Sequence, residues 1–248
     1  MSINWKETKA AIVRHGELKG VKDLLISDLD ALVSIDRQKE ELLKNTLNFL
    51  NDKGANHALL WGEMGCGKSS LVRAVFCKFM DKNLRLIEIS KFELVSLYEI
   101  LEEIRANLEF KFIIFCDDFS FEASDSAISE LKNLLEGSIQ APPKNALFYA
   151  TSNRKHLVKS QKNHENYIIE KESNRENLSL ADRFGLQISF YEMDVSEYMA
   201  VVKSYFDGVS VDEATLKREA LAYASSKGVR SARSARQFWL SFRSEFEK

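Results

Sequence analysis

Short apolar runs alternate with amphipathic stretches along most of the chain, and this pattern predicts strands that alternate with helices. Helical spacing of leucines follows Asp36, which could cap a first long helix, and similar spacing returns over 67–80, 92–106 and 124–136. The expected strands are HALLWG (57–62), LRLIEIS (84–90), KFIIFCDD (111–118), NALFYATSN (145–153) and GLQISFY (185–191). Alternation of this kind indicates a parallel sheet that is covered by helices on both faces.

The two ends of the chain differ from this central part. Residues 1–33 are mixed in character, and we expect one or two short helices there. After Tyr191 the strand pattern stops, and spacing predicts three helices over 194–206, 212–226 and 231–246. Residues 156–177 are polar and carry both charge signs, which predicts a mobile loop. The expected domains are therefore an N-terminal helical segment (1–33), an α/β core (34–192) and a small helical domain (193–248).

The stretch GEMGCGKSS (62–70) has the spacing of a phosphate-binding loop (P-loop) between a strand and a helix. Glycines allow backbone N–H groups to approach phosphate oxygens, and the helix that follows points its positive end at the same anion. We expect Lys68 to reach the β- and γ-phosphates and the Ser69 hydroxyl to bind Mg²⁺. The predicted ligands of ATP or ADP in this loop are Gly62, Glu63, Met64, Gly65, Cys66, Gly67, Lys68, Ser69 and Ser70. Cys66 is interpreted as a small packing residue rather than a redox switch.

Two carboxylates follow the third expected strand, where a parallel sheet presents its ligand crevice. Asp117 suits an outer-sphere or water-mediated magnesium contact, and Asp118 suits the polarisation of an attacking water. The alternative for both residues is that they only cap the loop that follows.

These motifs together resemble an AAA+ ATPase. More narrowly, the segments LVSIDRQKE, LRLIEISK, FCDDFSFE, LLEG, YATSNRKHL, LSLADRFGLQISFY and RSARQF resemble an uncharacterised bacterial family of AAA+-like ATP-binding proteins, from about Asp28 to about Phe238. The resemblance implies an α/β P-loop NTPase fold, with a parallel five-stranded sheet in the order 5-1-4-3-2 and a small all-helical lid.

The resemblance also implies roles for single residues. Asn153 matches the polar sensor that positions water near the γ-phosphate, although a turn-forming asparagine would look the same. Arg183 matches the arginine finger that AAA+ proteins insert into a neighbouring subunit's site, and the alternative is an ion pair with Asp182 or with the 155–177 loop. A homo-oligomer through Arg183 is therefore expected.

The helical tail of the chain carries Lys227, Arg230, Arg233, Arg236 and Arg243, with no acid between positions 227 and 243. The resemblance implies that one member contacts nucleotide, Arg230 first and Arg233 next. The other members could bind phosphates elsewhere.

Two further positions complete the predicted site. Val33 and Ile35 stand where such proteins bracket adenine, although plain core residues would look the same. Most AAA+ ATPases have glutamate where Asp118 stands, so slow turnover is expected, and Glu122 is a possible substitute base.

Composition narrows the class of protein. Of the 248 residues, 45% are hydrophobic, which is enough for a packed core. The net charge of −2 does not indicate a nucleic acid or a membrane as a partner. Three cysteines without CxxC spacing and four scattered histidines argue against disulfides and a zinc site. The charged start and the lack of a long apolar run predict a soluble, cytoplasmic protein.

The leading hypothesis from the sequence is an ATPase that hydrolyses Mg²⁺-ATP to act on an unknown macromolecule. The alternatives are a nucleotide-gated binding module with little hydrolysis and a DNA loader or remodeller. A small-molecule kinase is the least favoured reading.

Overall fold

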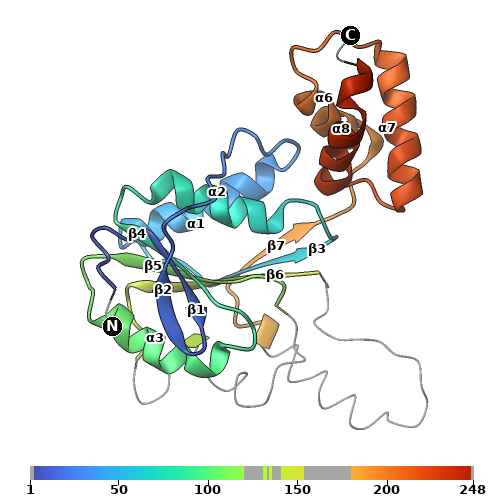
Figure 1. The fold of residues 1–248 in the computed structure, drawn as a ribbon. Coiled ribbons are helices and arrows are strands. Elements are labelled where there is room, and N and C mark those ends of the chain that lie inside the picture. Colours follow the sequence, from blue (N-terminus) through green and yellow to red (C-terminus); the bar gives the residue numbers. More distant parts are fainter. Residues whose placement is uncertain (1–2, 120–130, 133, 136–140, 154–179, 247–248) are drawn as a thin grey trace, which may run out of the picture.

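The computed structural model describes residues 3–119, 131–132, 134–135, 141–153 and 180–246. A seven-stranded sheet forms the centre of the molecule, with the strand order β2-β1-β4-β5-β6-β3-β7 (Figure 1). The strands are β1 Ala10–Arg14, β2 Glu17–Gly20, β3 Ala58–Gly62, β4 Leu84–Glu88, β5 Lys111–Cys116, β6 Ala146–Ser152 and β7 Leu186–Phe190. Strands β4, β5, β6, β3 and β7 are the five that the apolar runs predict, and all neighbours among them are parallel. The α/β class is confirmed, but the expectation of a five-stranded sheet is wrong because the N-terminal segment adds two strands.

The expectation of helices in residues 1–33 is also wrong, because β1 and β2 form a hairpin at the edge of the sheet. Strand β1 pairs in parallel with β4 and antiparallel with β2. His15 and Gly16 form the turn with φ angles of 54° and 74°, the left-handed conformation that two-residue hairpin turns require. Both turn N–H groups donate to the carboxylate of Glu93, at 2.9 Å each. The helical expectation failed because a five-residue apolar strand is too short for its period to be read.

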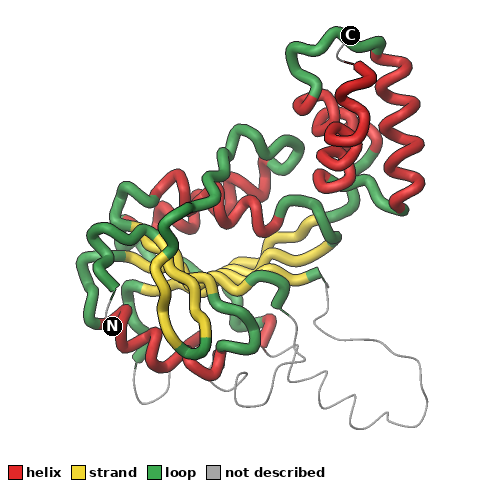
Figure 2. Tube along the Cα trace, in the orientation of Figure 1, coloured by secondary structure: helices red, strands yellow, loops and turns green. Residues whose placement is uncertain are grey.

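Helices cover both faces of the sheet (Figure 2). The helices of the core are α1 Asp36–Leu50, α2 Lys68–Phe79 and α3 Leu97–Arg105, which a 3₁₀ turn η1 Leu94–Ser96 precedes. Those that follow the sheet are α6 Val195–Tyr205, α7 Glu213–Lys227 and α8 Ala232–Phe246. Helices α1 and α2 lie on one face and α3 on the other (Figure 1). Each face has its own apolar core: Leu42, Leu71 and Val75 belong to the first, and Leu97 and Ile104 to the second.

The start of α1 differs from the sequence prediction. Ile35, not Asp36, is the capping residue, and it makes no side-chain cap hydrogen bond. Asp36 is the first helical residue, where its carboxylate accepts a hydrogen bond from Lys39 Nζ at 3.2 Å. The predicted helix over 124–136 and the predicted mobile loop over 156–177 lie largely or wholly outside the described residues.

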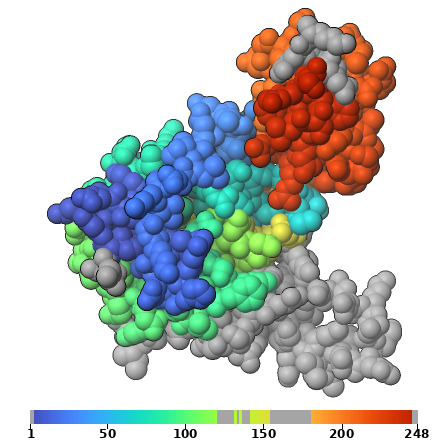
Figure 3. All heavy atoms as spheres, viewed as in Figure 1, coloured from blue at the N-terminus to red at the C-terminus, as the bar shows by residue number. Residues whose placement is uncertain are grey.

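The three C-terminal helices form a separate lobe against the core, which we call the lid (Figure 3). Its apolar centre includes Tyr198, Val202 and Phe238, each without measurable exposure. Asp194 and Glu197 form a reciprocal capping box at the start of α6, which satisfies two backbone N–H groups. Across the described part of the chain, no helix has the length and apolar character needed to cross a membrane.

Candidate nucleotide site

The P-loop connects the carboxyl end of β3 to the start of α2, as its spacing predicts. Gly62, Gly65 and Gly67 have φ angles of 127°, 76° and 96°, which residues with a Cβ rarely adopt. Gly67 is the capping residue of α2, so the amino end of that helix faces the loop. The backbone is therefore shaped to present N–H groups to an anion.

Gly62 is the most constrained of these positions. Gly62 is the last residue of β3, which pairs with β7, and it lies opposite Phe190. The N–H of the next residue, Glu63, donates to Phe190 O at 3.0 Å. A Cβ added at Gly62 would lie 1.8 Å from the same oxygen. The loop can leave the sheet at this point only because residue 62 has no side chain.

We expect Gly62→Ala to lower the free energy of unfolding by at least about 3 kcal/mol, because both the clash and the positive φ must be relieved. Urea denaturation measures the effect. Gly54→Ala is the matched control, since Gly54 has a φ of 80° and an added Cβ would lie in open space. Equal losses for the two variants would contradict the close approach to Phe190.

Lys68, in the first turn of α2, is buried at 6% exposure. Its Nζ donates to the carbonyl oxygens of Gly62 and Glu63, at 2.8 and 2.7 Å. Burial lowers the pKa of Lys68, while the neighbouring Cys66, Glu63 and the two aspartates act in the opposite direction. The ammonium group is thus held inside the loop by carbonyls that it can exchange for phosphate oxygens.

Cys66 packs inside the same loop with 2% exposure. Burial raises the pKa of its thiol to about 11. A thiol with so high a pKa is a poor nucleophile at neutral pH, which supports a packing role.

Asp117 gathers side chains from two elements, α2 and β6, at the carboxyl edge of the sheet. Its Oδ1 accepts hydrogen bonds from Ser69 Oγ at 2.6 Å and from Thr151 Oγ1 at 2.5 Å. Its Oδ2 accepts one from Arg73 at 3.2 Å. Ser69 and Asp117, the two predicted magnesium ligands, are therefore in direct contact.

Asp118 and Asn153 also meet. Asn153 Nδ2 donates to Asp118 Oδ1 at 2.6 Å, and both residues are exposed to the cavity. Asp118 has a φ of 52°, and its N–H donates to Thr151 Oγ1 at 2.9 Å. A non-glycine residue in this conformation is strained, and the hydrogen bond to Thr151 helps to stabilise it. Glu122, the possible substitute base, lies outside the described residues.

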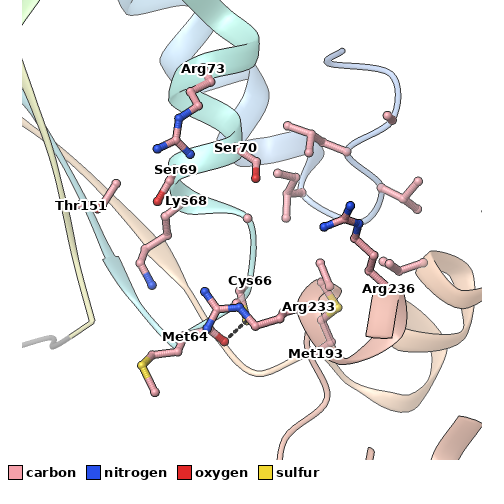
Figure 4. Close-up of a pocket in the computed structure, with 18 of the residues that line it drawn as sticks. Met64, Cys66, Lys68, Ser69, Ser70, Arg73, Thr151, Met193, Arg233 and Arg236 are labelled. Carbon is pink, nitrogen blue, oxygen red and sulfur yellow. Dashed lines mark hydrogen bonds between the residues drawn. The ribbon is translucent and has the colours of Figure 1, made fainter. Parts of the chain in front are cut away.

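A cavity of about 520 Å³ lies over the P-loop, between the core and the lid. Figure 4 shows Lys68, Ser69 and Arg73 on one side and the lid residues Arg233 and Arg236 on the other. Among the predicted site residues, the lining includes Ile35, Met64, Gly65, Cys66, Gly67, Lys68, Ser69, Ser70, Asp117, Asp118 and Asn153. It does not include Gly62, Glu63, Arg183 or Arg230.

Arg230, the first choice from the sequence for a nucleotide contact, is not the lid arginine that lines the cavity. Arg230 bonds Met193 O at 2.8 Å and pairs with Glu192 at 3.1 Å, so it anchors the connection between core and lid. Arg233 and Arg236 line the cavity instead. Arg233 N–H donates to Gly65 O at 3.1 Å, so α8 begins directly on the P-loop. The structure therefore does not bring Arg230 to the cavity.

Apolar side chains line the part of the cavity away from Lys68. Val33 and Ile35 come from the segment before α1, and Met193, Val201 and Tyr205 come from the lid side. Ile35 Cδ1 would lie 3.6 Å from a Cβ at Gly67, so the apolar wall adjoins the loop itself. Adenine binding between these walls stays a prediction.

Arg183 lies on a turn before β7, where its N–H donates to Leu180 O at 3.2 Å. The neighbouring Leu180 and Phe184 are buried and fix this turn. Strand β7 runs parallel to β3, so its amino end lies at the edge of the sheet opposite to the P-loop. Five residues of strand separate the two edges by roughly 16 Å. Arg183 therefore does not serve the cavity of its own chain.

The donor set fits Mg²⁺ bound with a nucleotide. Ser69, Asp117 and Thr151 offer oxygen atoms only, and magnesium typically takes one or two protein carboxylates together with phosphate oxygens. The described part of the chain contains no cluster of three or more histidine, cysteine, aspartate or glutamate side chains that could hold a metal by itself. A cavity of this size, with one basic and one apolar part, fits a nucleotide rather than a fully caged metal.

Sequence reasoning did not assign Thr151 or Arg73 to the site, and it named Arg236 only as one member of the basic cluster. The ATSN run could have indicated Thr151, since the polar tip of a strand next to Asp117 offers more than one side chain. Arg73 lies four residues after Ser69, one helical turn, and this spacing places it on the same face of α2. No sequence signal distinguishes Arg236 from the other arginines of α8.

Among solved structures, the Thermotoga maritima RuvB Holliday junction branch migration motor has a similar fold, with a TM-score of 0.52 and 13% identity over 87% of this chain and 72% of that chain. Two mutants of the same protein match over the same shares, one with a TM-score of 0.52 at 13% identity and one with 0.51 at 11%. At such low identity the likeness concerns the fold alone. A search of curated proteins finds no match.

One protein family matches nearly the whole chain. The family described as "Protein of unknown function (DUF815)" aligns with residues 3–246, a span that includes the P-loop, Asp117, Asn153 and the lid arginines. The chain belongs to this family.

Proposed function

We propose that the chain binds Mg²⁺-ATP in the cavity over the P-loop, hydrolyses it slowly, and uses the resulting movement of the lid to act on a macromolecular partner. The observation that carries this proposal is the convergence of Lys68, the Ser69–Asp117 pair and Arg233 on one cavity. A phosphate chain in this cavity would meet the P-loop amides, one buried ammonium group and the lid guanidinium groups.

Each group has a distinct part in the proposed reaction. Bound magnesium would supply charge neutralisation for the phosphates, and Ser69 and Asp117 would hold it. Asp118 orients the attacking water and accepts its proton, and Asn153 holds the Asp118 carboxylate at 2.6 Å. Arg233 and Arg236 join the phosphates to the lid, so lid position depends on the phosphates present.

A nucleotide-gated binding module is the second candidate, and the Asp118 region favours it. Aspartate is one methylene shorter than the glutamate found in most AAA+ ATPases, and a misplacement of about 1 Å can lower a rate roughly 10²-fold. The carboxylate is also engaged by Asn153. Slow or absent hydrolysis would leave a protein whose two states differ by the nucleotide that it holds.

The structure gives the DNA-loader hypothesis no specific support. That hypothesis rested on analogy at the level of the fold and on the basic residues between 227 and 243. Arg233 and Arg236 line the cavity, and Arg230 pairs with Glu192. We therefore do not propose nucleic acid as the partner.

We expect Asp118→Asn to lower the rate of ATP hydrolysis about 10²-fold, because the amide cannot accept the proton. The affinity for ADP should change less than about threefold, since the amide oxygen can still accept from Asn153. Phosphate release and ADP binding measure the two effects. A wild-type rate at the level of the blank, with tight ADP binding, would support the binding module instead. An unchanged rate in the variant would remove Asp118 from the reaction.

A further inference from the structure

Arg73 bridges two carboxylates at the magnesium site. Its guanidinium lies 3.2 Å from Asp117 Oδ2 and 3.9 Å from Glu88 Oε2. It also lies over the ring of Phe115, 5.5 Å from the centroid. The side chain lines the cavity and is only 25% exposed, so this pairing is shielded from bulk water on most sides.

The fold brings the two acids together. Strands β4 and β5 are parallel neighbours, and Glu88, the last residue of β4, lies opposite Phe115. Asp117 follows β5 directly. Arg73 projects from α2 onto this edge, one turn after Ser69. One cation from the helix therefore spans the carboxyl ends of two adjacent strands.

The two oxygens of Asp117 have different partners. Oδ1 faces the hydroxyl groups of Ser69 and Thr151, and Oδ2 faces Arg73. Magnesium held by Ser69 and Asp117 would lie within a few ångströms of the guanidinium. Two cations that share one carboxylate repel each other, and this repulsion is strong where water is partly excluded.

We propose that Arg73 is a resident counter-ion of the magnesium site, which competes with Mg²⁺ for Asp117 and turns to Glu88 when magnesium arrives with the nucleotide. Glu88 makes this exchange feasible, because a guanidinium that leaves Asp117 keeps a carboxylate partner that is already 3.9 Å away. Arg73 thus sets how strongly magnesium and nucleotide assist each other's binding. The proposal rests on the proposed nucleotide site.

The coupling between magnesium and nucleotide is measured without hydrolysis. The dissociation constant of ADP is determined in excess EDTA and in excess magnesium. The value in EDTA divided by the value in magnesium reports the coupling. We expect Arg73→Gln to raise this ratio about fivefold, since competition is lost, and Glu88→Gln to lower it about fivefold, since Arg73 then stays on Asp117. Arg73→Lys should stay near the wild-type ratio. Lys78→Gln, an exposed cation on the same helix, is the control and should leave the ratio unchanged.

A double variant separates this exchange from a direct attraction between Glu88 and magnesium. If Glu88 acts through Arg73, the Arg73→Gln/Glu88→Gln protein has the ratio of Arg73→Gln alone. A full Glu88 effect in the double variant, or a ratio that falls or stays unchanged in Arg73→Gln, overturns the proposal. Thermal unfolding checks each variant, and if Arg73→Gln does not fold, Arg73→Met replaces it in both the single and the double comparison. Wild-type protein that binds no ADP would instead refute the nucleotide site itself.

Discussion

Lys68→Ala should reduce ATP hydrolysis about 10³-fold and weaken ATP binding markedly. The buried ammonium of Lys68 lies inside the P-loop, bonded to Gly62 O and Glu63 O, and is the only lysine that lines the cavity in the described part of the chain. Alanine removes the point charge that would face the β- and γ-phosphates. It also leaves two carbonyl oxygens near the phosphates without their donor, which adds repulsion.

Lys78→Ala is the matched control for this variant, because Lys78 lies on the same helix, is exposed, and does not line the cavity. Phosphate release at saturating Mg²⁺-ATP measures turnover, and a thermal melt confirms that each variant is folded. A Lys68→Ala rate within a factor of about two of the wild type would contradict the assigned role of the loop.

Arg183→Ala should also reduce hydrolysis, by about 10³-fold, if sites are shared between subunits. Arg183 lies at the opposite edge of the sheet from its own P-loop, as the parallel pairing of β3 and β7 requires. A guanidinium at this place can reach a phosphate only in another copy of the chain. We therefore expect the wild-type rate per chain to rise with protein concentration.

Mixing the two inactive variants tests this arrangement directly. In a mixture of Lys68→Ala and Arg183→Ala chains, about one interface in four has an intact P-loop facing an intact arginine. Up to about a quarter of the activity should return. Full activity of Arg183→Ala alone, alongside an inactive Lys68→Ala, would show that each chain works by itself. Light scattering with ATP, with ADP and without nucleotide gives the oligomeric state in each condition.

Much of the core could be predicted from the sequence because its signals are local and strong. Buried parallel strands are continuous apolar runs, so β5 is readable as KFIIFC, and the P-loop has a fixed spacing between a strand and a helix. The contact between Ser69 and Asp117 also follows, because the loop and the tip of β5 lie at the same edge of a parallel sheet.

The remaining features depend on tertiary contacts that leave little local signal. The β1–β2 hairpin is held by Glu93, which is far away in the sequence, and by the edge of β4. The choice between Arg230 and Arg233 depends on how α8 docks on Gly65, where an added Cβ would lie 2.8 Å from Arg233 Cβ. Spacing along a helix gives the faces of that helix, but not which face meets the core.

The central claim is that the cavity over the P-loop binds the phosphates of an adenine nucleotide together with magnesium. Equilibrium dialysis with labelled ADP at millimolar magnesium tests it most directly, with Lys68→Ala and Lys78→Ala proteins measured in parallel. We expect one saturable site per chain in the wild type and in Lys78→Ala, weakened by EDTA and lost in Lys68→Ala. Absence of saturable binding in the wild type, or equal binding in the Lys68→Ala protein, would contradict the claim.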